Sequence, residues 1–285
     1  MSRNPYYDLK RTVTAPVAAA RRRRSGDVPE AANGMLELQG HSKAARELAA
    51  LKAIDPDYLH RADLNGDSVV VDVGAYRGDG AAQIHALYGC RVYAFEPNPA
   101  AFEAMQERFA DVDRVMPVPY GLGGADATLS LDLAGPGSSL HGLREEDRSP
   151  SATTVEVQVR DVVDAFGDLG LDHIDFLKVN IEGAEFDLFD RAIEAGIVPN
   201  VRYLLIQFHE WHPRSHRRRR RIRRSLRQTH DLVWDHPWIF ELWCARSHPH
   251  PPPLELTPEL EAAVLAHLRA RRTPPEPGTE PTSEV

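Results

Sequence analysis

The chain has 285 residues, a net charge of −8 and hydrophobic side chains at 42% of its positions. This length suits one α/β domain of about 200 residues with extensions, or at most two domains. No apolar run approaches the roughly 20 residues needed to span a bilayer, and the N-terminus has no apolar signal-peptide core. We therefore expect a cytoplasmic protein without a membrane segment. Two cysteines, Cys90 and Cys244, provide neither a disulfide framework nor metal-ligand spacing, so no metal is expected.

The N-terminal residues are polar and rich in arginine, which predicts a disordered arm over 1–35. Helical spacing of apolar residues follows and predicts a helical cap within 36–66. Short apolar runs then alternate with helical segments, a pattern typical of a doubly wound α/β sheet. Strands are expected at 68–73, 91–96, 114–119, 174–179, 201–208, 231–235 and 238–244, with helices at 79–88, at 99–110 and from Asp161. The runs at 174–179 and 201–208 are almost wholly apolar, as buried parallel strands are, and 238–244 is expected as an antiparallel edge strand.

Residues 121–160 interrupt this alternation. Glycines and prolines there separate two short alternating segments, which predicts a β-hairpin-like insertion with a loop between its arms. Beyond the sheet, the pattern predicts a C-terminal helix within 247–272 and a disordered tail at 273–285. The main domain is thus expected to span 67–246.

The most informative motif runs from Val69 to Gly80 and ends a β-branched strand in a glycine-bearing turn. Gly74 lets the backbone leave the strand without a Cβ clash, and Gly78 is expected to let a cofactor approach the next helix. Glu96 ends the following strand, where an acid can accept hydrogen bonds from both hydroxyls of a ribose. Together these positions predict a site for an adenosyl cofactor.

The spacing of this motif disfavours a dinucleotide. A dinucleotide fingerprint that starts at Gly74 needs glycine at two positions that hold Tyr76 and Asp79. Asp72 lies just before the turn, where it can orient a cationic amino group or bind the backbone amides of its own turn. S-adenosylmethionine carries such an amino group and NAD does not.

Three motifs together resemble the FkbM family of S-adenosylmethionine-dependent methyltransferases: the opening motif, Glu96-Pro97-Asn98, and the segment 177–185. The resemblance covers roughly 68–244. It implies a class I methyltransferase fold, S-adenosylmethionine as cofactor, and methyl transfer, usually to a hydroxyl oxygen of a sugar or secondary metabolite. The family motif usually reads Lys-x-Asp-x-Glu-Gly-Ala-Glu, and here Asn180 replaces its first acid.

The resemblance implies that Asp72, Gly74 and Gly78 hold the methionine part of the cofactor and that Glu96 holds its ribose. Asn98 either contacts the adenosine or caps the next helix, and Gly121 and Leu122 either flank the adenine or form a plain turn. The full set expected to bind the cofactor comprises Asp72, Gly74, Ala75, Tyr76, Gly78, Glu96, Pro97, Asn98, Gly121, Leu122 and Asn180.

Catalytic groups are expected beyond the carboxyl ends of the fourth and fifth strands, where ligands of open α/β sheets bind. His209 is the preferred base because its unperturbed pKa is near 6.5; otherwise it hydrogen-bonds a neighbouring loop. Asn180 can position a substrate or the cofactor by hydrogen bonds. Glu182 binds the acceptor or a divalent cation, or acts as a first-turn acid of a helix. The residues expected to bind the substrate are Glu210, Trp211, Ser138 and Ser139.

Nine arginines and no acids lie between Arg214 and His230, which invites a nucleic-acid interpretation. No aromatic residues interleave with them as stacking platforms, so we favour a helix that packs through Ile222 and Leu226 and leaves its arginines in solvent. The expected partner is therefore a small-molecule hydroxyl acceptor, with a homo-oligomer left open. A nucleic-acid methyltransferase and a non-catalytic adenosyl-binding protein, the latter prompted by Asn180, remain the alternatives.

Overall fold

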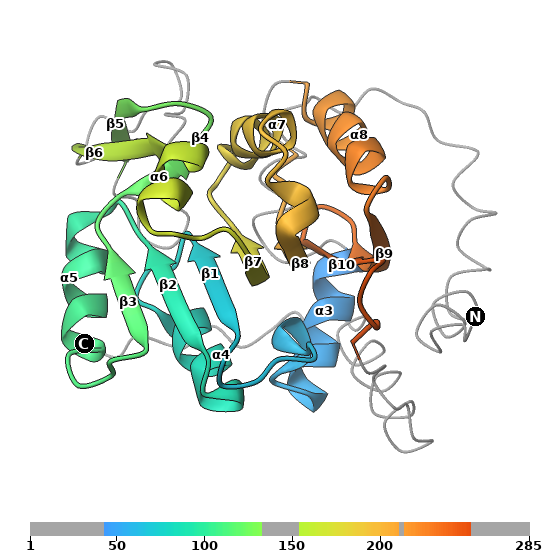
Figure 1. The fold of residues 1–285 in the computed structure, drawn as a ribbon, viewed down its shortest axis with the longest axis horizontal. Helices are drawn as coiled ribbons and strands as arrows, with labels where there is room; N and C mark the ends of the chain where they lie inside the picture. Colours follow the sequence, from blue (N-terminus) through green and yellow to red (C-terminus); the bar gives the residue numbers. More distant parts are fainter. Residues whose placement is uncertain (1–42, 133–153, 211–213, 252–285) are drawn as a thin grey trace, which may run out of the picture. The chain divides into compact units, whose positions relative to one another are not determined.

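A computed structural model describes residues 43–132, 154–210 and 214–251 (Figure 1). The chain divides into two compact units. One contains helix α3 (Lys43–Ile54), which confirms a helix within 36–66, although its role as a cap stays a prediction. The other, Leu59–Pro252, contains every strand described below. The arm at 1–35, the tail at 273–285 and most of the expected helix at 247–272 lie outside the described residues.

The larger unit is built on a seven-stranded sheet in the order β3-β2-β1-β7-β8-β10-β9. Pairing from β3 through β8 is parallel, and β10 runs antiparallel to both of its neighbours. The strands are β1 (Val69–Val73), β2 (Arg91–Phe95), β3 (Val115–Val118), β7 (Ile174–Val179), β8 (Val201–Ile206), β9 (His230–His236) and β10 (Phe240–Ala245).

The expectation that the last strand forms the edge is wrong. β10 inserts between β8 and β9, and β9 is the edge strand. Five consecutive residues of β10, from Glu241 to Ala245, are buried, whereas β9 keeps four partly exposed positions. A strand with so much buried surface is stabilised by neighbours on both sides, and the more polar β9 suits the edge.

Helices cover both faces of the sheet (Figure 1). α4 (Asp79–Tyr88) and α5 (Pro99–Arg108) lie on one face, and α6 (Val162–Asp168), α7 (Glu185–Glu194) and α8 (Ser215–Leu226) lie on the other. Asn98 caps α5 by accepting the N–H groups of Ala100 and Ala101, and Pro99 occupies the first turn. Asp161 caps α6 through the N–H of Val163, as expected. Single turns of 3₁₀-helix occur at η2 (Tyr58–His60) and η4 (Val198–Asn200).

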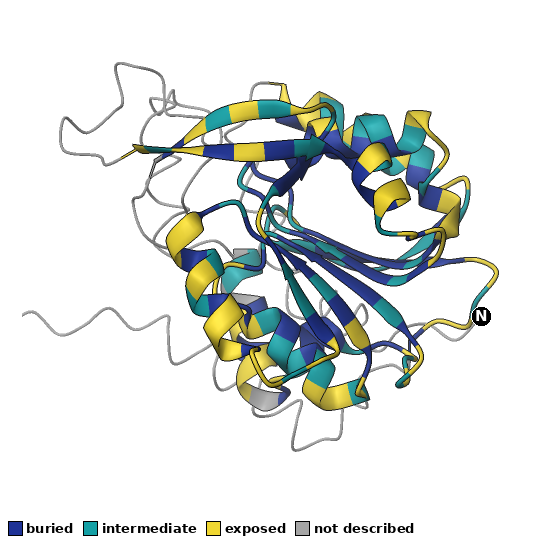
Figure 2. Ribbon diagram, turned by 60° about the vertical axis from the view of Figure 1, so that its left-hand side comes forward, coloured by how far each residue is buried: buried dark blue, intermediate teal, exposed yellow. Residues whose placement is uncertain are grey.

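The hydrophobic core lies between the sheet and α6, α7 and α8. Figure 2 shows the strands of the central sheet mostly buried, and exposed positions on the helices and along the β5–β6 hairpin. Phe186, Phe189 and Phe208 pack together there, with ring centroids 5.3 Å apart for Phe186–Phe208 and 6.1 Å apart for Phe189–Phe208. No described helix is both long and apolar enough to cross a membrane.

The expected insertion forms a second, three-stranded sheet in the order β4-β6-β5. β5 (Ala127–Asp132) and β6 (Thr154–Asp161) pair antiparallel, with Thr128 opposite Gln158, which confirms the hairpin. β4 (Gly121–Gly123) adds a short parallel strand on the other side of β6. The loop between the arms, with Ser138 and Ser139, lies outside the described residues.

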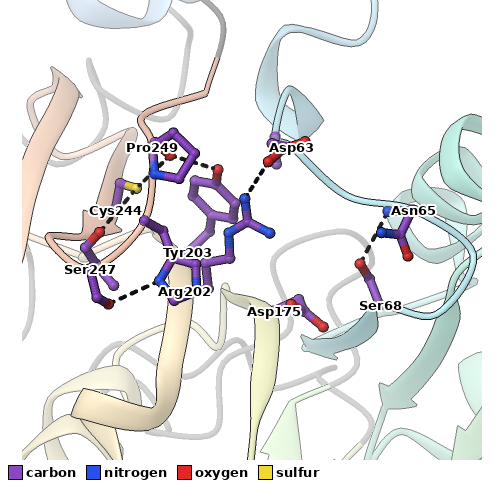
Figure 3. A network of polar contacts seen from close by, with 12 residues as sticks. Asp63, Asn65, Ser68, Asp175, Arg202, Tyr203, Cys244, Ser247 and Pro249 are labelled. Carbon is purple, nitrogen blue, oxygen red and sulfur yellow. Dashed lines mark hydrogen bonds and ion pairs between the residues drawn. The ribbon is translucent and has the colours of Figure 1, made fainter.

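Polar contacts join the amino ends of the central strands (Figure 3). The guanidinium of Arg202 on β8 lies 2.5 Å from the Asp63 carboxylate, and Asp175 on β7 accepts the N–H of Val69 on β1 at 2.9 Å. The Tyr203 hydroxyl donates to the carbonyl of Pro249 at 3.2 Å. The loops with the candidate site residues follow parallel strands and therefore emerge at the opposite, carboxyl end.

The sheet changes its direction of growth at β1. The chain adds β2 and β3 on one side of β1 and then crosses to add β7 and β8 on the other. In open α/β sheets, ligands bind at the carboxyl ends of the strands at such a switch point. The loops after β1 and β7 are therefore the place to look for a site.

Candidate active site

Gly74 lies where the loops after β1 and β7 meet. Its φ is +81°, in the left-handed region that favours glycine, and a Cβ there would lie 2.0 Å from the carbonyl oxygen of Asn180. Its N–H donates to the carbonyl of Phe95 at 3.0 Å. The expected conformational reason for Gly74 is confirmed, and cofactor binding by Gly74 stays a prediction.

Gly78 has a packing role that the sequence did not suggest, and its role in cofactor approach stays a prediction. Its φ is +79°, and a Cβ would lie 2.4 Å from the ring of Phe109, at the C-terminal end of α5. The missing side chain thus lets the start of α4 pack against α5. Gly80 was not predicted as a site residue, yet a Cβ there would lie 3.0 Å from Asp72 Oδ2. The only sequence signal for it was a third glycine directly after Gly78-Asp79.

Asp72 has a cationic partner within the chain. It lies opposite Lys178 in the β1–β7 register, and the lysine Nζ is 2.5 Å from Asp72 Oδ1. Only 3% of the Asp72 side chain and 14% of the Lys178 side chain are exposed. Asp72 Oδ2 is buried and receives no hydrogen bond from a described residue. If Asp72 orients an amino group of a ligand, Oδ2 is therefore the oxygen that accepts its hydrogen bond.

Glu96 ties together the loops after β1 and β2. Its Oε2 accepts the N–H of Tyr76 at 2.7 Å, and its Oε1 accepts the N–H of Asn98 at 2.8 Å. Burial raises the pKa of Glu96, and the two N–H bonds offset only part of that rise. A carboxylate has about four acceptor sites, so about two remain for ribose hydroxyls. Tyr76 itself has a φ of +53° and an exposed side chain, whereas Ala75 is buried.

The region after β3 differs in part from expectation. The side chain of Leu122 is fully buried in the core, and Gly121 is buried against Pro97, where a Cβ would lie 3.3 Å from the proline ring. Tyr120 was not predicted as a site residue, and its ring packs edge-on against Phe95 with centroids 5.6 Å apart. An aromatic residue at a strand end was the available signal.

Tyr120 also lines an open groove of about 700 Å³ between the end of β3 and the β5–β6 hairpin. The guanidinium of Arg160 lies 5.3 Å from the Tyr120 ring centroid. The groove is lined by Pro119, Tyr120, Asp126, Ala127, Thr128, Gln158, Val159 and Arg160.

His209 lies buried between two carboxylates at the carboxyl end of the sheet. Its Nδ1 is 3.2 Å from Glu185 Oε1, and its Nε2 is 3.3 Å from Glu182 Oε2. Glu185 is fully buried and also accepts the N–H groups of His209 at 2.8 Å and Gly183 at 2.7 Å. The described residues hold no group of three His, Cys, Asp or Glu side chains suited to a metal ion.

This environment corrects the expectation of an unperturbed histidine. Burial alone would lower the pKa of His209, but the hydrogen bonds and charges of Glu182 and Glu185 outweigh it and raise that pKa to about 9. At neutral pH the ring is therefore an imidazolium and holds no free lone pair. A ring that carries this proton is unsuited to accept another, and the base role expected of His209 stays an untested prediction.

The raised pKa makes stability depend on pH. The pKa of His209 is about 9 in the folded chain and near 6.5 in the unfolded chain, so its contribution is complete below pH 6.5 and disappears as the pH rises to 9. At 1.36 kcal/mol per pKa unit, this contribution is on the order of 3 kcal/mol. We expect the unfolding free energy of the wild type, measured by urea denaturation, to fall by that much more than that of His209→Gln over this range. Parallel pH profiles of the two proteins would contradict the assignment.

Glu182 is the most accessible acid of this cluster, with 28% of its side chain exposed. Its φ is +50°, a strained conformation that is rare outside glycine and is often found at functional sites. Asn180 precedes it by two residues, and its buried Oδ1 receives no hydrogen bond from a described residue. The loop after β7 thus presents an amide oxygen and a carboxylate at the switch point.

The expected substrate residues are only partly described. Glu210 is engaged with His216, whose Nε2 lies 2.9 Å from Glu210 Oε1, and its carbonyl accepts the Ser215 hydroxyl at 2.7 Å. These contacts hold the start of α8. Trp211, like Ser138 and Ser139, lies outside the described residues.

The parallel sheet, its antiparallel β10, the alternating helices and the glycine turn at the switch point define a class I methyltransferase of Rossmann-like fold. The model of the methyltransferase FkbM domain matches residues 72–231, more than half of the chain. The chain belongs to the FkbM methyltransferase family. No curated protein matches the chain.

Solved structures with similar folds have low sequence identity to this chain. An FkbM methyltransferase from Methylobacillus flagellatus KT is 16% identical over 74% of this chain and 57% of its own, with a TM-score of 0.45. This chain therefore spans less than two thirds of that protein. A putative rRNA methylase from Clostridium thermocellum is 12% identical over 68% of this chain and 94% of its own, with a TM-score of 0.43. A putative methyltransferase from Streptococcus mutans, in complex with SAH, is 12% identical over 70% and 96%, with a TM-score of 0.40. All three scores lie below 0.5, so the family assignment rests on the domain match.

Membership of the family makes S-adenosylmethionine the methyl donor. The residues at the switch point fit this molecule. Its ammonium group and ribose hydroxyls are hydrogen-bond donors, and the site offers acceptors: Asp72 Oδ2 and Asn180 Oδ1 are buried without a described donor, and Glu96 retains acceptor capacity. A buried acceptor without a donor is costly, which is consistent with a ligand that supplies the donors.

Proposed function

We propose that this methyltransferase methylates a hydroxyl oxygen of a small secondary metabolite or sugar. The single observation that carries the proposal is the chemistry of the loop after β7, where a partly exposed carboxylate, Glu182, follows the amide Asn180. An acceptor hydroxyl needs a group that receives its proton as the new bond to carbon forms, and Glu182 is the candidate.

The other acids and bases around the site are less suitable. Asn180 has no basic group, His209 is already protonated at neutral pH, and Glu185 is fully buried under two N–H donors. Among Asn180, Glu182, Glu185 and His209, only Glu182 has a carboxylate on a partly exposed side chain.

Each group has a separate role in this proposal. Bound S-adenosylmethionine supplies an electrophilic methyl group. Asp72 and Asn180 would accept hydrogen bonds from its amino-acid part, and Glu96 from its ribose hydroxyls. The imidazolium of His209, fixed by Glu185, would orient the Glu182 carboxylate, which takes the hydroxyl proton. These contacts align the acceptor oxygen for in-line displacement.

Glu182→Gln should lower kcat for a hydroxyl acceptor about 100-fold, because a positioned base contributes about that much or more. The Kd for S-adenosylmethionine should stay within about twofold, since Glu182 is not assigned to the cofactor. Glu194→Gln, which changes an exposed acid at the end of the adjoining helix α7, is the matched control. Unchanged kcat in Glu182→Gln would remove Glu182 as the base.

Methyl transfer to paired acceptors tests the proposal as a whole. The full chain is incubated with methyl-labelled S-adenosylmethionine and pairs such as glucose with glucosamine and a phenol with the matching aniline. Products are identified by mass spectrometry. Methylation of the hydroxyl members supports the proposal, and exclusive methylation of nitrogen contradicts it. Folded protein that binds the cofactor but transfers no methyl group to any acceptor would favour the non-catalytic alternative.

A further inference from the structure

The arginines of α8 separate into two sets in the structure. A helix with all its arginines in solvent was expected, and this is wrong for Arg218, Arg219 and Arg223, whose side chains are largely buried. Arg218 and Arg221 pair with acids of α7, and Arg219 and Arg223 pair with acids of β9 and β10. The acidic partners are Asp187, Asp190, Asp235 and Glu241.

These ion pairs clamp the two flanks of the helix. Arg218 lies 2.5 Å from Asp187, and Arg219 lies 2.6 Å from Glu241, which is almost fully buried. Only 13% of the Arg219 and Arg223 side chains is exposed. The guanidiniums of this first set are therefore paired with acids of the chain itself.

The second set comprises Arg217, Arg220, Arg224 and Arg227, which we term the outer arginine row. All four are exposed, and none pairs with an acid of the described residues. Their spacing of three, four and three residues puts them on one face of the helix, opposite the buried Ile222 and Leu226. With a rise of 1.5 Å per residue, the row extends over about 15 Å.

We infer that the outer arginine row binds the phosphate backbone of a nucleic-acid strand. Guanidinium groups match phosphate oxygens in bidentate geometry, and a row of guanidiniums without acidic partners matches a chain of regularly spaced phosphates. This inference goes beyond the proposed function, because it concerns recruitment and not the methyl-transfer chemistry.

The composition of the row favours nucleic acid over a membrane or a protein. From Arg217 to Arg227 the only apolar residues are Ile222 and Leu226, and both are fully buried. No apolar side chain is left to insert into lipid or to form the apolar centre typical of protein interfaces. Interfaces with nucleic acid are, in contrast, polar and strongly positive. Because no aromatic residue lies between Arg214 and Arg227, we expect binding without base stacking or sequence preference.

The row starts near the candidate site. The Ser215 hydroxyl at the start of α8 donates to the carbonyl of Glu210, the residue after His209. A strand bound along the row would thus extend away from the carboxyl end of the sheet.

Fluorescence anisotropy of the full chain with a labelled oligouridine RNA of about 20 nucleotides tests this surface. Four phosphate contacts predict a slope of about −3 for log Kobs against log salt, so affinity should fall about 50-fold between about 50 and 200 mM salt. The variant with Arg217, Arg220, Arg224 and Arg227 all changed to Gln should lose most of the binding and most of the slope.

Two single substitutions on the same helix provide a matched comparison. Arg224→Gln removes an unpaired guanidinium and should weaken binding roughly five- to tenfold at about 50 mM salt. Arg221→Gln removes the same charge from a residue paired with Asp190 and should weaken it less than about twofold. Equal effects of the two would show that only net charge matters and would overturn the inference.

Three other results would also overturn it. They are no RNA binding at low salt, RNA binding that survives the quadruple change, and binding to phosphatidylserine vesicles through the outer arginine row without binding to RNA. Calorimetric titration with S-adenosylmethionine on the same preparations separates the two proposals. If the protein binds S-adenosylmethionine but not RNA, the proposed role of the outer arginine row is refuted and the methyltransferase assignment is unaffected.

Discussion

Gly74→Ala should lower the free energy of unfolding by more than about 4 kcal/mol, the range reached by severe core and backbone changes. The new Cβ would lie 2.0 Å from the Asn180 carbonyl oxygen, which belongs to backbone and cannot rotate away. The residue would also keep a φ of +81°, which is unfavourable for alanine. Because whole domains are stable by only about 5–15 kcal/mol, much of the protein should unfold or the β1 and β7 loops should separate.

Gly89→Ala is the matched control, measured by urea denaturation alongside Gly74→Ala. Gly89 also has a positive φ, +64°, but nothing lies within 4 Å of its added Cβ. It should therefore cost only about 1–2 kcal/mol, the penalty of the left-handed backbone. Similar losses at both glycines would mean that close approach of the β7 loop is not what requires Gly74.

Lys178→Met should destabilise the protein by about 3–5 kcal/mol, because it leaves Asp72 buried without its cation. The double variant Asp72→Asn with Lys178→Met should recover most of this loss, since it removes the stranded charge. Urea denaturation of both variants measures the difference.

Arg246→Met serves as the control for this pair. Its partner is Asp231, and about half of each side chain is exposed, so the expected loss is below about 1 kcal/mol. If Lys178→Met were as mild as Arg246→Met, the Asp72–Lys178 pair would not be an important buried interaction.

Local signals in the sequence predicted much of the fold. Asn98 and Asp161 are helix caps because their side chains accept N–H groups within three residues, a relation visible in the chain itself. The same holds for Gly74, where a β-branched strand ends in a glycine turn, and for the hairpin arms that pair Thr128 with Gln158. The family motif then located the loop after β7.

Contacts between distant segments were not predictable in this way. Asp72 is 106 residues from Lys178 and becomes its neighbour only because β1 pairs with β7. His209 has its pKa raised by Glu182 and Glu185, which follow a different strand. The place of β10 and the ion pairs of α8 likewise depend on which strands are adjacent in the sheet. Sequence periodicity does not contain that information.

Calorimetric titration of the full chain with S-adenosylmethionine and with NAD, repeated on Glu96→Ala, tests the central claim most directly. We predict micromolar binding of S-adenosylmethionine and no binding of NAD. Glu96→Ala should weaken the binding free energy for S-adenosylmethionine by about 1–3 kcal/mol, because buried polar groups then lack hydrogen-bond partners. Glu103→Ala, which changes an exposed acid of α5, should bind like the wild type. Folded protein that binds NAD and not S-adenosylmethionine would contradict the account.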